Sequence, residues 1–151
     1  MSDGFGGAYV SAALDARRCE RLLAQSSLGR VVLSVGCLPA AVPVHVDVAH
    51  GNVLLTCHPG PVLTAAERRD VISVETDGEE ADGTTWSVLA TGVARVVDAG
   101  EPLRDAVDSR LARLLDRGAT LVAVPLTTLR GERTWWSIND EGAHRGPAVR
   151  A

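Results

Sequence analysis

Short hydrophobic runs rich in β-branched residues, separated by turn-forming residues, dominate the middle of the chain. Such short runs are typical of strands rather than helices. His50 and Gly51 separate two of the runs, and this pair favours a hairpin between them. The pattern predicts six strands, at residues 30–35, 41–48, 52–57, 71–76, 85–97 and 120–128.

Apolar residues at helical spacing occur in three other segments. The first predicts a helix over 15–24, with Asp15 as its N-cap. The second predicts a short helix over 61–68, because proline favours the first position of a helix. The third predicts a helix over 102–117 with one leucine-rich face and a stop at Gly118.

The links between strands indicate how the strands are arranged. Residues 49–51 and 77–84 are too few for helical crossovers, so the strands are expected to be antiparallel. A small barrel would close the edges of such a sheet. Gly92 lies inside the 85–97 run, which indicates a bulge, a bend or a close approach of backbone or ligand. We therefore predict a mainly β fold, an antiparallel barrel of about six strands with two or three helices.

The length of 151 residues suggests one folded domain, which we place at residues 12–138. Residues 1–11 are rich in small residues and are expected to be flexible. Residues 139–151 have little to bury and are expected to be disordered.

Composition and charge exclude several classes of protein. The net charge is -4 and the arginines are scattered, which argues against nucleic-acid binding. Nothing in the sequence resembles a membrane span or a secretory signal, so a cytoplasmic location is expected. The cysteines, Cys19, Cys37 and Cys57, are odd in number and do not predict a disulfide framework.

Residues 55–63, LTCHPGPVL, connect a predicted strand to a predicted helix. The first N–H groups of a helix lack internal partners, so such a turn can hold an anion. Lysine and arginine are absent from this stretch, although a phosphate site normally contains one.

The order of these parts resembles that of actinobacterial members of the pyridoxamine 5'-phosphate oxidase-like superfamily. The resemblance extends over roughly residues 15–130, and no single motif in it is specific alone. It implies a split β-barrel that binds flavin mononucleotide (FMN), usually a homodimer with two flavin sites at the subunit interface. The matching residues are Cys19, Leu22-Leu23-Ala24, Gly29-Arg30-Val31, Pro43-Val44-His45, Gly51, Pro59-Gly60, Trp86-Ser87-Val88 and Gly92.

The resemblance implies a phosphate grip that this chain has changed. Family members commonly place Arg and Thr or Ser at the end of the third strand, and Thr and Lys after the loop glycine. Here the positions hold Thr56, Cys57, Pro61 and Val62. Each lost charge-assisted hydrogen bond is worth about 1.5–3 kcal/mol, so phosphate binding is expected to weaken by about 10²–10⁴. Arg68 or Arg69, further along the helix, could replace the lost charges.

The resemblance also implies which residues contact the cofactor. His45 shares one strand face with Asp47, which fits either a cofactor contact or a solvated polar face. Trp86 fits either a wall of the site or a core position, and Cys57 fits a small buried residue better than a nucleophile or metal ligand. The candidate cofactor-binding residues are His45, Thr56, Cys57, His58, Pro59, Gly60, Trp86 and Ser87.

Three hypotheses for function follow. The first is a flavin-dependent oxidoreductase with FMN, or with a related deazaflavin, and with no assigned catalytic acid or base. The second is a dimeric barrel that has lost flavin and acts as an accessory protein or binds another small molecule. The third is a metal- or haem-binding barrel that uses His45 or His58. Trp135 and Trp136 are expected to anchor a subunit interface.

Overall fold

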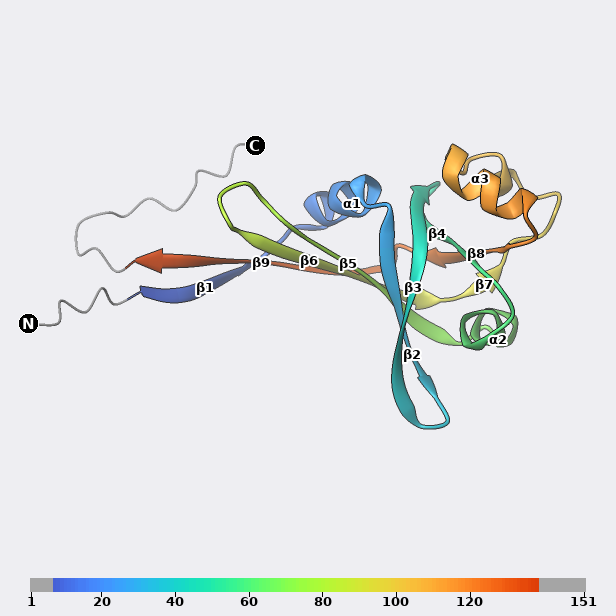
Figure 1. Cartoon of the computed structure of the whole chain (residues 1–151), viewed down its shortest axis with the longest axis horizontal. Coiled ribbons are helices and arrows are strands. Elements are labelled where there is room, and N and C mark those ends of the chain that lie inside the picture. The colour runs from blue at the N-terminus through green and yellow to red at the C-terminus, as the bar shows by residue number, and fades with distance from the viewer. Residues whose placement is uncertain (1–6, 139–151) are drawn as a thin grey trace, which may run out of the picture.

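The structure is a computed structural model that describes residues 7–138 (Figure 1). In chain order its elements are β1 (Gly7–Ala13), α1 (Ala16–Gln25), β2 (Leu28–Val35), β3 (Leu38–Ala49), β4 (Asn52–Cys57), α2 (Pro61–Arg68), β5 (Val71–Glu79), β6 (Thr85–Val93), β7 (Arg95–Val96), the 3₁₀ helix η1 (Pro102–Arg104), α3 (Ser109–Asp116), β8 (Thr120–Pro125) and β9 (Thr128–Ile138).

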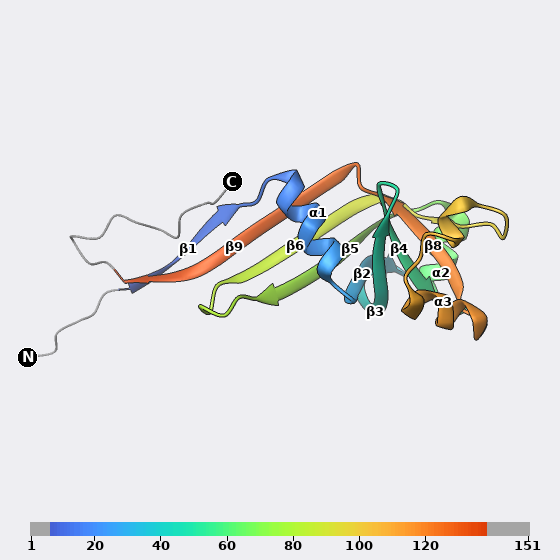
Figure 2. The ribbon, with the colours of Figure 1, turned by 90° about the horizontal axis from the view of Figure 1, so that it is seen from above.

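All strand pairs are antiparallel, in the order β1-β9-β6-β5-β2-β3-β4-β8-β7. Strand β3 joins two halves of this sheet, because it pairs with β2 as far as His45 and with β4 from Val46 onward. The sheet curls so that β6 approaches β8. A Cβ atom added to Gly92 would lie 2.9 Å from the carbonyl oxygen of Pro125. This approach closes the barrel (Figure 2).

The mainly β prediction is confirmed, but the described part of the chain has nine strands rather than six. Strands β1 and β9 were not predicted as such. Residues 7–11, expected to be flexible, belong to β1, whose backbone pairs with that of β9. The expectations for residues 1–6 and 139–151 lie outside the described residues.

The helix predictions are partly correct. Asp15 caps α1 by accepting a hydrogen bond from the N–H of Arg18 at 2.7 Å, and α2 has the predicted bounds. The predicted helix over 102–117 is wrong as a single element, since it divides into η1 and α3. The physical reason is Asp108, whose carboxylate caps a new helix by accepting from the N–H groups of Arg110 and Leu111.

The predicted strand 85–97 also divides, into β6 and β7. Between them the N–H of Ala94 donates to the carbonyl of Asp70 instead of continuing the strand ladder. Gly92 lies just before this bend and directly against β8, so both the bend and the close approach expected for this glycine are present.

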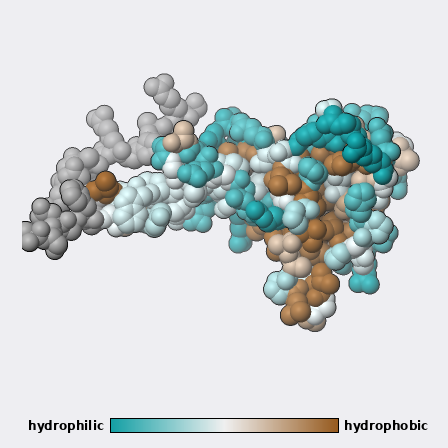
Figure 3. Space-filling view, in the orientation of Figure 1, coloured by the Kyte–Doolittle hydropathy of each residue, from teal (hydrophilic) through white to brown (hydrophobic). Residues whose placement is uncertain are grey.

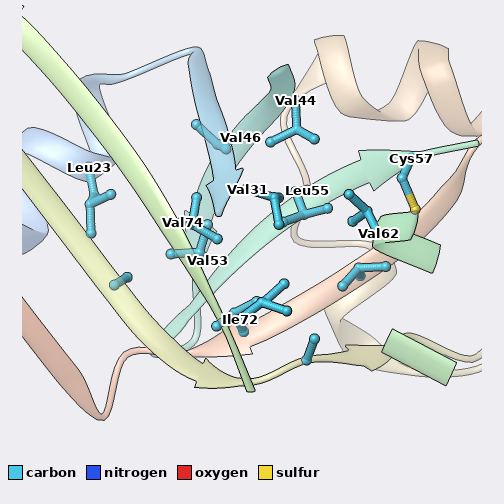
Figure 4. Close-up of a cluster of buried hydrophobic side chains, with 14 of the residues drawn as sticks. Leu23, Val31, Val44, Val46, Val53, Leu55, Cys57, Val62, Ile72 and Val74 are labelled. Carbon is cyan, nitrogen blue, oxygen red and sulfur yellow. The ribbon is translucent and has the colours of Figure 1, made fainter. Parts of the chain in front are cut away.

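The main core fills the inside of the barrel, where valine and leucine side chains from most strands meet those of α1 and α2 (Figure 4). Helix α1 covers one end, and its Cys19 lies so close to Gly131 that glycine is needed there. A second cluster, which includes Leu54, Leu111 and Leu121, lies under η1 and α3 on the outside of β4 and β8. None of the helices among residues 7–138 has the length and hydropathy needed to cross a membrane.

Candidate functional site

The side chains of β1, β2, β3, β5, β6 and β9 that point away from the main core form a surface that we call the outer face. Strand β6 shows the alternation clearly, because Val88 is buried in the core and Ser87 is exposed. Ser87 pairs with Asp77 of β5 and Glu132 of β9, so the three side chains point to the same side.

Two adjacent depressions lie on the outer face, and both are bordered by Ser87 and Glu132. One, of about 380 Å³, also has Asp77, Glu79, Thr85 and Thr134 in its lining. The other, of about 450 Å³, is more apolar and includes Ala13, Leu89, Leu129 and Arg130. Together they form a shallow groove across β6 and β9.

Charged side chains of the outer face are partly paired. Arg30 contacts the carboxylates of Glu75 at 3.1 Å and Asp77 at 2.6 Å. Both carboxylates raise the pKa of this guanidinium, chiefly because the guanidinium donates a hydrogen bond to Asp77. Arg130 has no ion pair within the part of the chain that the structure describes. The groove therefore has one arginine at one end and several carboxylates at the other.

His45 lies on the outer face of β3, exposed, at the point where this strand leaves β2 for β4. Its neighbour Asp47 has a structural role, since its carboxylate accepts from the N–H of Val48 at 2.8 Å and from that of Asp108 at 2.9 Å. Asp47 thus fixes the start of α3 against β3, and its hydrogen-bonding capacity is used on backbone rather than on the imidazole of His45.

Thr56 and Cys57 end strand β4 on opposite sides. The side chain of Thr56 points away from the main core, to the same side of β4 as that of Leu54, and it is only 7% exposed. Cys57 points into the main core near Val62 (Figure 4). Burial, with a smaller contribution from the charge of Glu67, raises the pKa of the Cys57 thiol to about 11. Cys57 therefore stays protonated at neutral pH, which suits a buried apolar residue and not a nucleophile.

The turn His58-Pro59-Gly60 is exposed and leads into α2. Gly60 is the N-cap residue of α2, and its backbone receives no side-chain cap. Val62 is buried in the core, so a side chain at this position does not reach an external ligand. The first free N–H groups of α2 thus remain available to an anion, and the first two helix positions, Pro61 and Val62, carry no positive charge.

Trp86 and Ser87 are neighbours with different roles. The indole of Trp86 covers Gly78, where an added Cβ would lie 2.5 Å from the ring, and it packs against the main core. This location fits the core interpretation of Trp86, and the residue also borders the smaller depression of the groove. Ser87 points the other way, into the groove.

The predicted residues therefore form two groups. His45, Thr56 and the turn at 58–60 lie where β3, β4 and α2 meet, whereas Ser87 lies in the groove. Strands β2 and β5 stand between the two groups, so about 14 Å separates His45 from Ser87 along the sheet. Within residues 7–138, no three His, Cys, Asp or Glu side chains gather as a metal-binding set.

Sequence reasoning missed most of the groove. Its carboxylates, Asp77 and Glu132, come from a predicted loop and from the unpredicted strand β9. The only signal in the sequence was the alternation around Ser87, which marks that residue as facing away from the core.

The chain is similar in sequence and in fold to proteins that are already known. The sequence profile of the pyridoxamine 5'-phosphate oxidase family matches residues 15–137. No curated protein matches the chain significantly.

Several solved structures resemble the chain closely. An FAD-binding protein from Mesorhizobium loti has a TM-score of 0.74 at 19% identity, covering 85% of this chain and 99% of that one. An FAD-binding protein from Mycobacterium smegmatis has a TM-score of 0.60 at 27% identity, covering 82% and 98%. An FAD- and haem-binding protein from Mycobacterium smegmatis has a TM-score of 0.67 at 15% identity, covering 86% and 76%.

These likenesses confirm the superfamily and the split-barrel fold that the sequence resemblance implied. The matched region, residues 15–137, takes in β2 to β8 and nearly all of β9. The chain belongs to the pyridoxamine 5'-phosphate oxidase family.

Proposed function

We propose that the protein binds a flavin on its outer face and acts as a small flavin-dependent oxidoreductase. The observation that carries the proposal is the open groove at Ser87, on the outer face of a barrel of this family. The FAD-binding proteins among the similar structures support a flavin in general. FMN is the form we propose, with a deazaflavin as the related alternative.

The residues of the groove suit the ring of a flavin. Ser87 offers a hydroxyl and a strand backbone, and Leu89 offers an apolar surface, which together match the usual mixture in a cofactor site. When bound, a flavin supplies hydride transfer at its N5 atom. The chain's part is to orient the ring and to limit its contact with water. A catalytic acid or base is not assigned.

The residues near α2 suit a phosphate only partly. The backbone N–H groups at the helix start favour an anion, and exposed His45 lies on the same side of the sheet. Arg68 and Arg69, however, are at the other end of α2, which is eight residues and about 12 Å long. This position argues against their replacing the lost charges, so the phosphate should add little to the affinity.

We also propose that the protein works as a homodimer through the outer face. Ten large hydrophobic side chains are exposed among residues 7–138, and seven of them point to this face by strand alternation. They are Tyr9, Leu28, Val32, Val71, Val93, Trp136 and Ile138. Exposed apolar surface of this extent is rare on monomers.

The three free cysteines fit a reducing compartment, which supports the proposed cytoplasmic location. Cys19 and Cys57 are buried and Cys37 is exposed.

A second candidate function is a dimeric barrel without flavin that binds another small molecule as an accessory protein. The observation that favours it is the lack of a basic side chain at the start of α2, where Pro61 and Val62 stand. Under this alternative the groove and the dimer remain, while flavin affinity is absent.

Titration of the protein with riboflavin, FMN and FAD, followed by flavin fluorescence, tests the proposal. We expect saturable binding, with FMN favoured over riboflavin by about tenfold or less, because one weak anion contact is worth about 1 kcal/mol. Ser87→Leu, which fills the groove, should weaken binding by about tenfold. Thr127→Leu, at an exposed turn position, should change it by about twofold at most. Absence of binding by every flavin would leave the accessory-protein function ahead.

A further inference from the structure

Strand β1 lies at one edge of the sheet. Among residues 7–138 it pairs with β9 and with no other strand. The pairing of β6 with β9 ends at Thr134, whereas β1 continues to pair with β9 as far as Ile138, so the two strands form a ribbon that projects from the barrel (Figures 1 and 2). The side of β1 that faces away from β9 thus presents the backbone N–H and C=O groups of an unpaired strand edge.

Strand β1 lacks the features that usually protect such an edge. Its sequence, GAYVSAA, contains no charged residue and no proline. Its register with β9 runs from the pair Gly7 and Ile138 to the pair Ala13 and Glu132 without a bulge. Residues 8–13 are all exposed, so no helix of the described chain covers the strand. Charged residues, proline, bulges and covering helices are the common protections of edge strands, so the free edge of β1 is open to another strand.

Other open edges of the described sheet carry features that oppose pairing. The β2–β3 hairpin is apolar on its surface (brown in Figure 3), but the open edge of β3 contains Pro39 and Pro43. The end of β5 carries Asp77 and Glu79. Strand β7, at the opposite end of the strand order from β1, is two residues long, includes Arg95 and packs against α2. The fold therefore protects these edges and leaves β1 without such protection.

Two copies of β1 match each other as an antiparallel pair. The register that pairs all seven residues has its two-fold axis at Val10, which then lies opposite the same residue of the other copy. Tyr9 lies opposite Ser11, and the remaining pairs contain only glycine and alanine. Gly7, which has no side chain, falls opposite Ala13, close to the point where the chain turns into α1. Like charges do not meet in this pair, and the central contact joins two β-branched side chains, which suits a sheet.

A second copy also supplies what the ribbon lacks. A pair of strands alone is only marginally stable in water, and three or more strands are needed for independent stability. Edge pairing places the ribbon in a four-stranded sheet, in the order β9-β1-β1-β9. Each copy brings an edge of the same length that is equally free of charge, so the two edges complement each other over all seven residues.

We propose that β1 is a strand-addition edge, through which two copies of the chain join their sheets around a two-fold axis at Val10. This contact differs from the proposed packing of the outer face, because it uses the backbone of β1 and because Val10 points to the side of the ribbon opposite Tyr9. Where outer-face dimers form, the edge contact joins two of them into a larger assembly. The contact does not depend on the proposed flavin function.

Val10→Lys tests the edge contact. Opposite Cβ atoms in an antiparallel pair lie about 4.5–5.5 Å apart, so the variant brings two like charges together at the axis. Sedimentation velocity over a concentration series follows the step at which the wild-type assembly doubles in mass through this edge. The dissociation constant of that step should rise by about tenfold or more in Val10→Lys, and Val10→Glu should have the same effect.

Mixing the two variants gives the specific readout. An equimolar mixture of Val10→Lys and Val10→Glu should bring the dissociation constant back to within about threefold of wild type, because an ammonium group then faces a carboxylate. Ser137→Lys is the matched control, since it adds the same charge on the same side of the ribbon but on β9, behind the edge. This control should change the constant by about twofold at most. Circular dichroism checks that all variants are folded.

Equal masses of wild type and Val10→Lys at every concentration would overturn the edge contact. Two variants that each dissociate but do not recombine when mixed would overturn the two-fold register at Val10. A weakening by Ser137→Lys as large as that by Val10→Lys would also overturn the contact, because it would show a general effect of charge on the ribbon. Recombination in the mixture, with Ser137→Lys unaffected, would support the edge contact whether or not the protein binds flavin.

Discussion

Gly92→Ala should destabilise the protein because β6 packs directly against β8 at this residue. The added Cβ would lie 2.9 Å from the carbonyl oxygen of Pro125 and 3.3 Å from a methyl group of Val124. The first atom belongs to the backbone and cannot rotate away, so the two strands must move apart. Overpacking of this kind costs about 1–3 kcal/mol. Replacing glycine also lowers the entropy of the unfolded chain, which returns about 0.4–1 kcal/mol.

A matched control isolates the steric part. Gly100→Ala places its Cβ in open space, so only the gain from the unfolded chain applies there. The free energies of unfolding of the two variants should therefore differ by about 1–3 kcal/mol, with Gly92→Ala the less stable. Urea unfolding at one fixed protein concentration measures the difference, since the proposed dimerisation would make stability depend on concentration. Equal stability of the two variants would show that β6 and β8 do not close the barrel as described.

Three further predictions concern side chains of the core and of the α3 junction. The pKa of Cys57, raised from 9.0 to about 11 by burial, implies stability that is fully present below pH 9 and lost as the pH rises toward 11. The free energy of unfolding lost through this thiol is about 2–3 kcal/mol. Measured across this pH range, the free energy of unfolding of Cys57→Ala should therefore fall less than that of wild type. An equal fall in both proteins would refute the raised pKa of Cys57. With Ellman's reagent the native protein should show one fast thiol, because Cys37 is exposed while Cys19 and Cys57 are buried; three fast thiols would contradict this burial. Asp47→Ala should lower the free energy of unfolding by about 1.5–3 kcal/mol, since a charged acceptor of two backbone N–H groups is lost. A change below about 0.5 kcal/mol would show that the junction of α3 with β3 does not depend on this carboxylate.

Local chemistry in the sequence was enough to predict several elements. Asp15 and the proline at the start of α2 mark helix starts by their own hydrogen-bonding and backbone properties. The hairpin at His50-Gly51 follows from two residues that both adopt positive φ, at 49° and 70°. Cys57 was expected to be a small buried residue because no base or metal ligands could be identified for it, and β4 is indeed buried from Val53 to Cys57.

Elements that depend on distant pairing were not predictable in this way. Strand β1 is composed of small residues that are mostly exposed, and it is a strand because β9 pairs with it. In β9, Trp135 and Trp136 face opposite sides, so the two tryptophans give no simple pattern of burial. The continuous stripe of leucines favours one long helix before and through α3. Asp108 interrupts it, because its side chain caps a new helix.

The candidate site was predictable only in part for the same reason. Ser87 was identified through the family resemblance, but Asp77 and Glu132 join it only through the register of three strands. Trp86 could wall the site or fill the core, and the folded structure shows it both packed against the core over Gly78 and in the lining of one depression of the groove. Val62 occupies a position where the family resemblance implied a lysine, yet its burial is visible only in the folded structure.

The most direct test of the account is sedimentation velocity of the protein mixed with FMN, recorded where flavin absorbs and polypeptide does not. If the outer face binds flavin between two protomers, the visible absorbance should move with the dimer boundary. The amount of co-sedimenting flavin should fall when dilution dissociates the dimer. Flavin that stays at the rate of the free molecule at every protein concentration, beside a sedimenting protein boundary, would contradict the account.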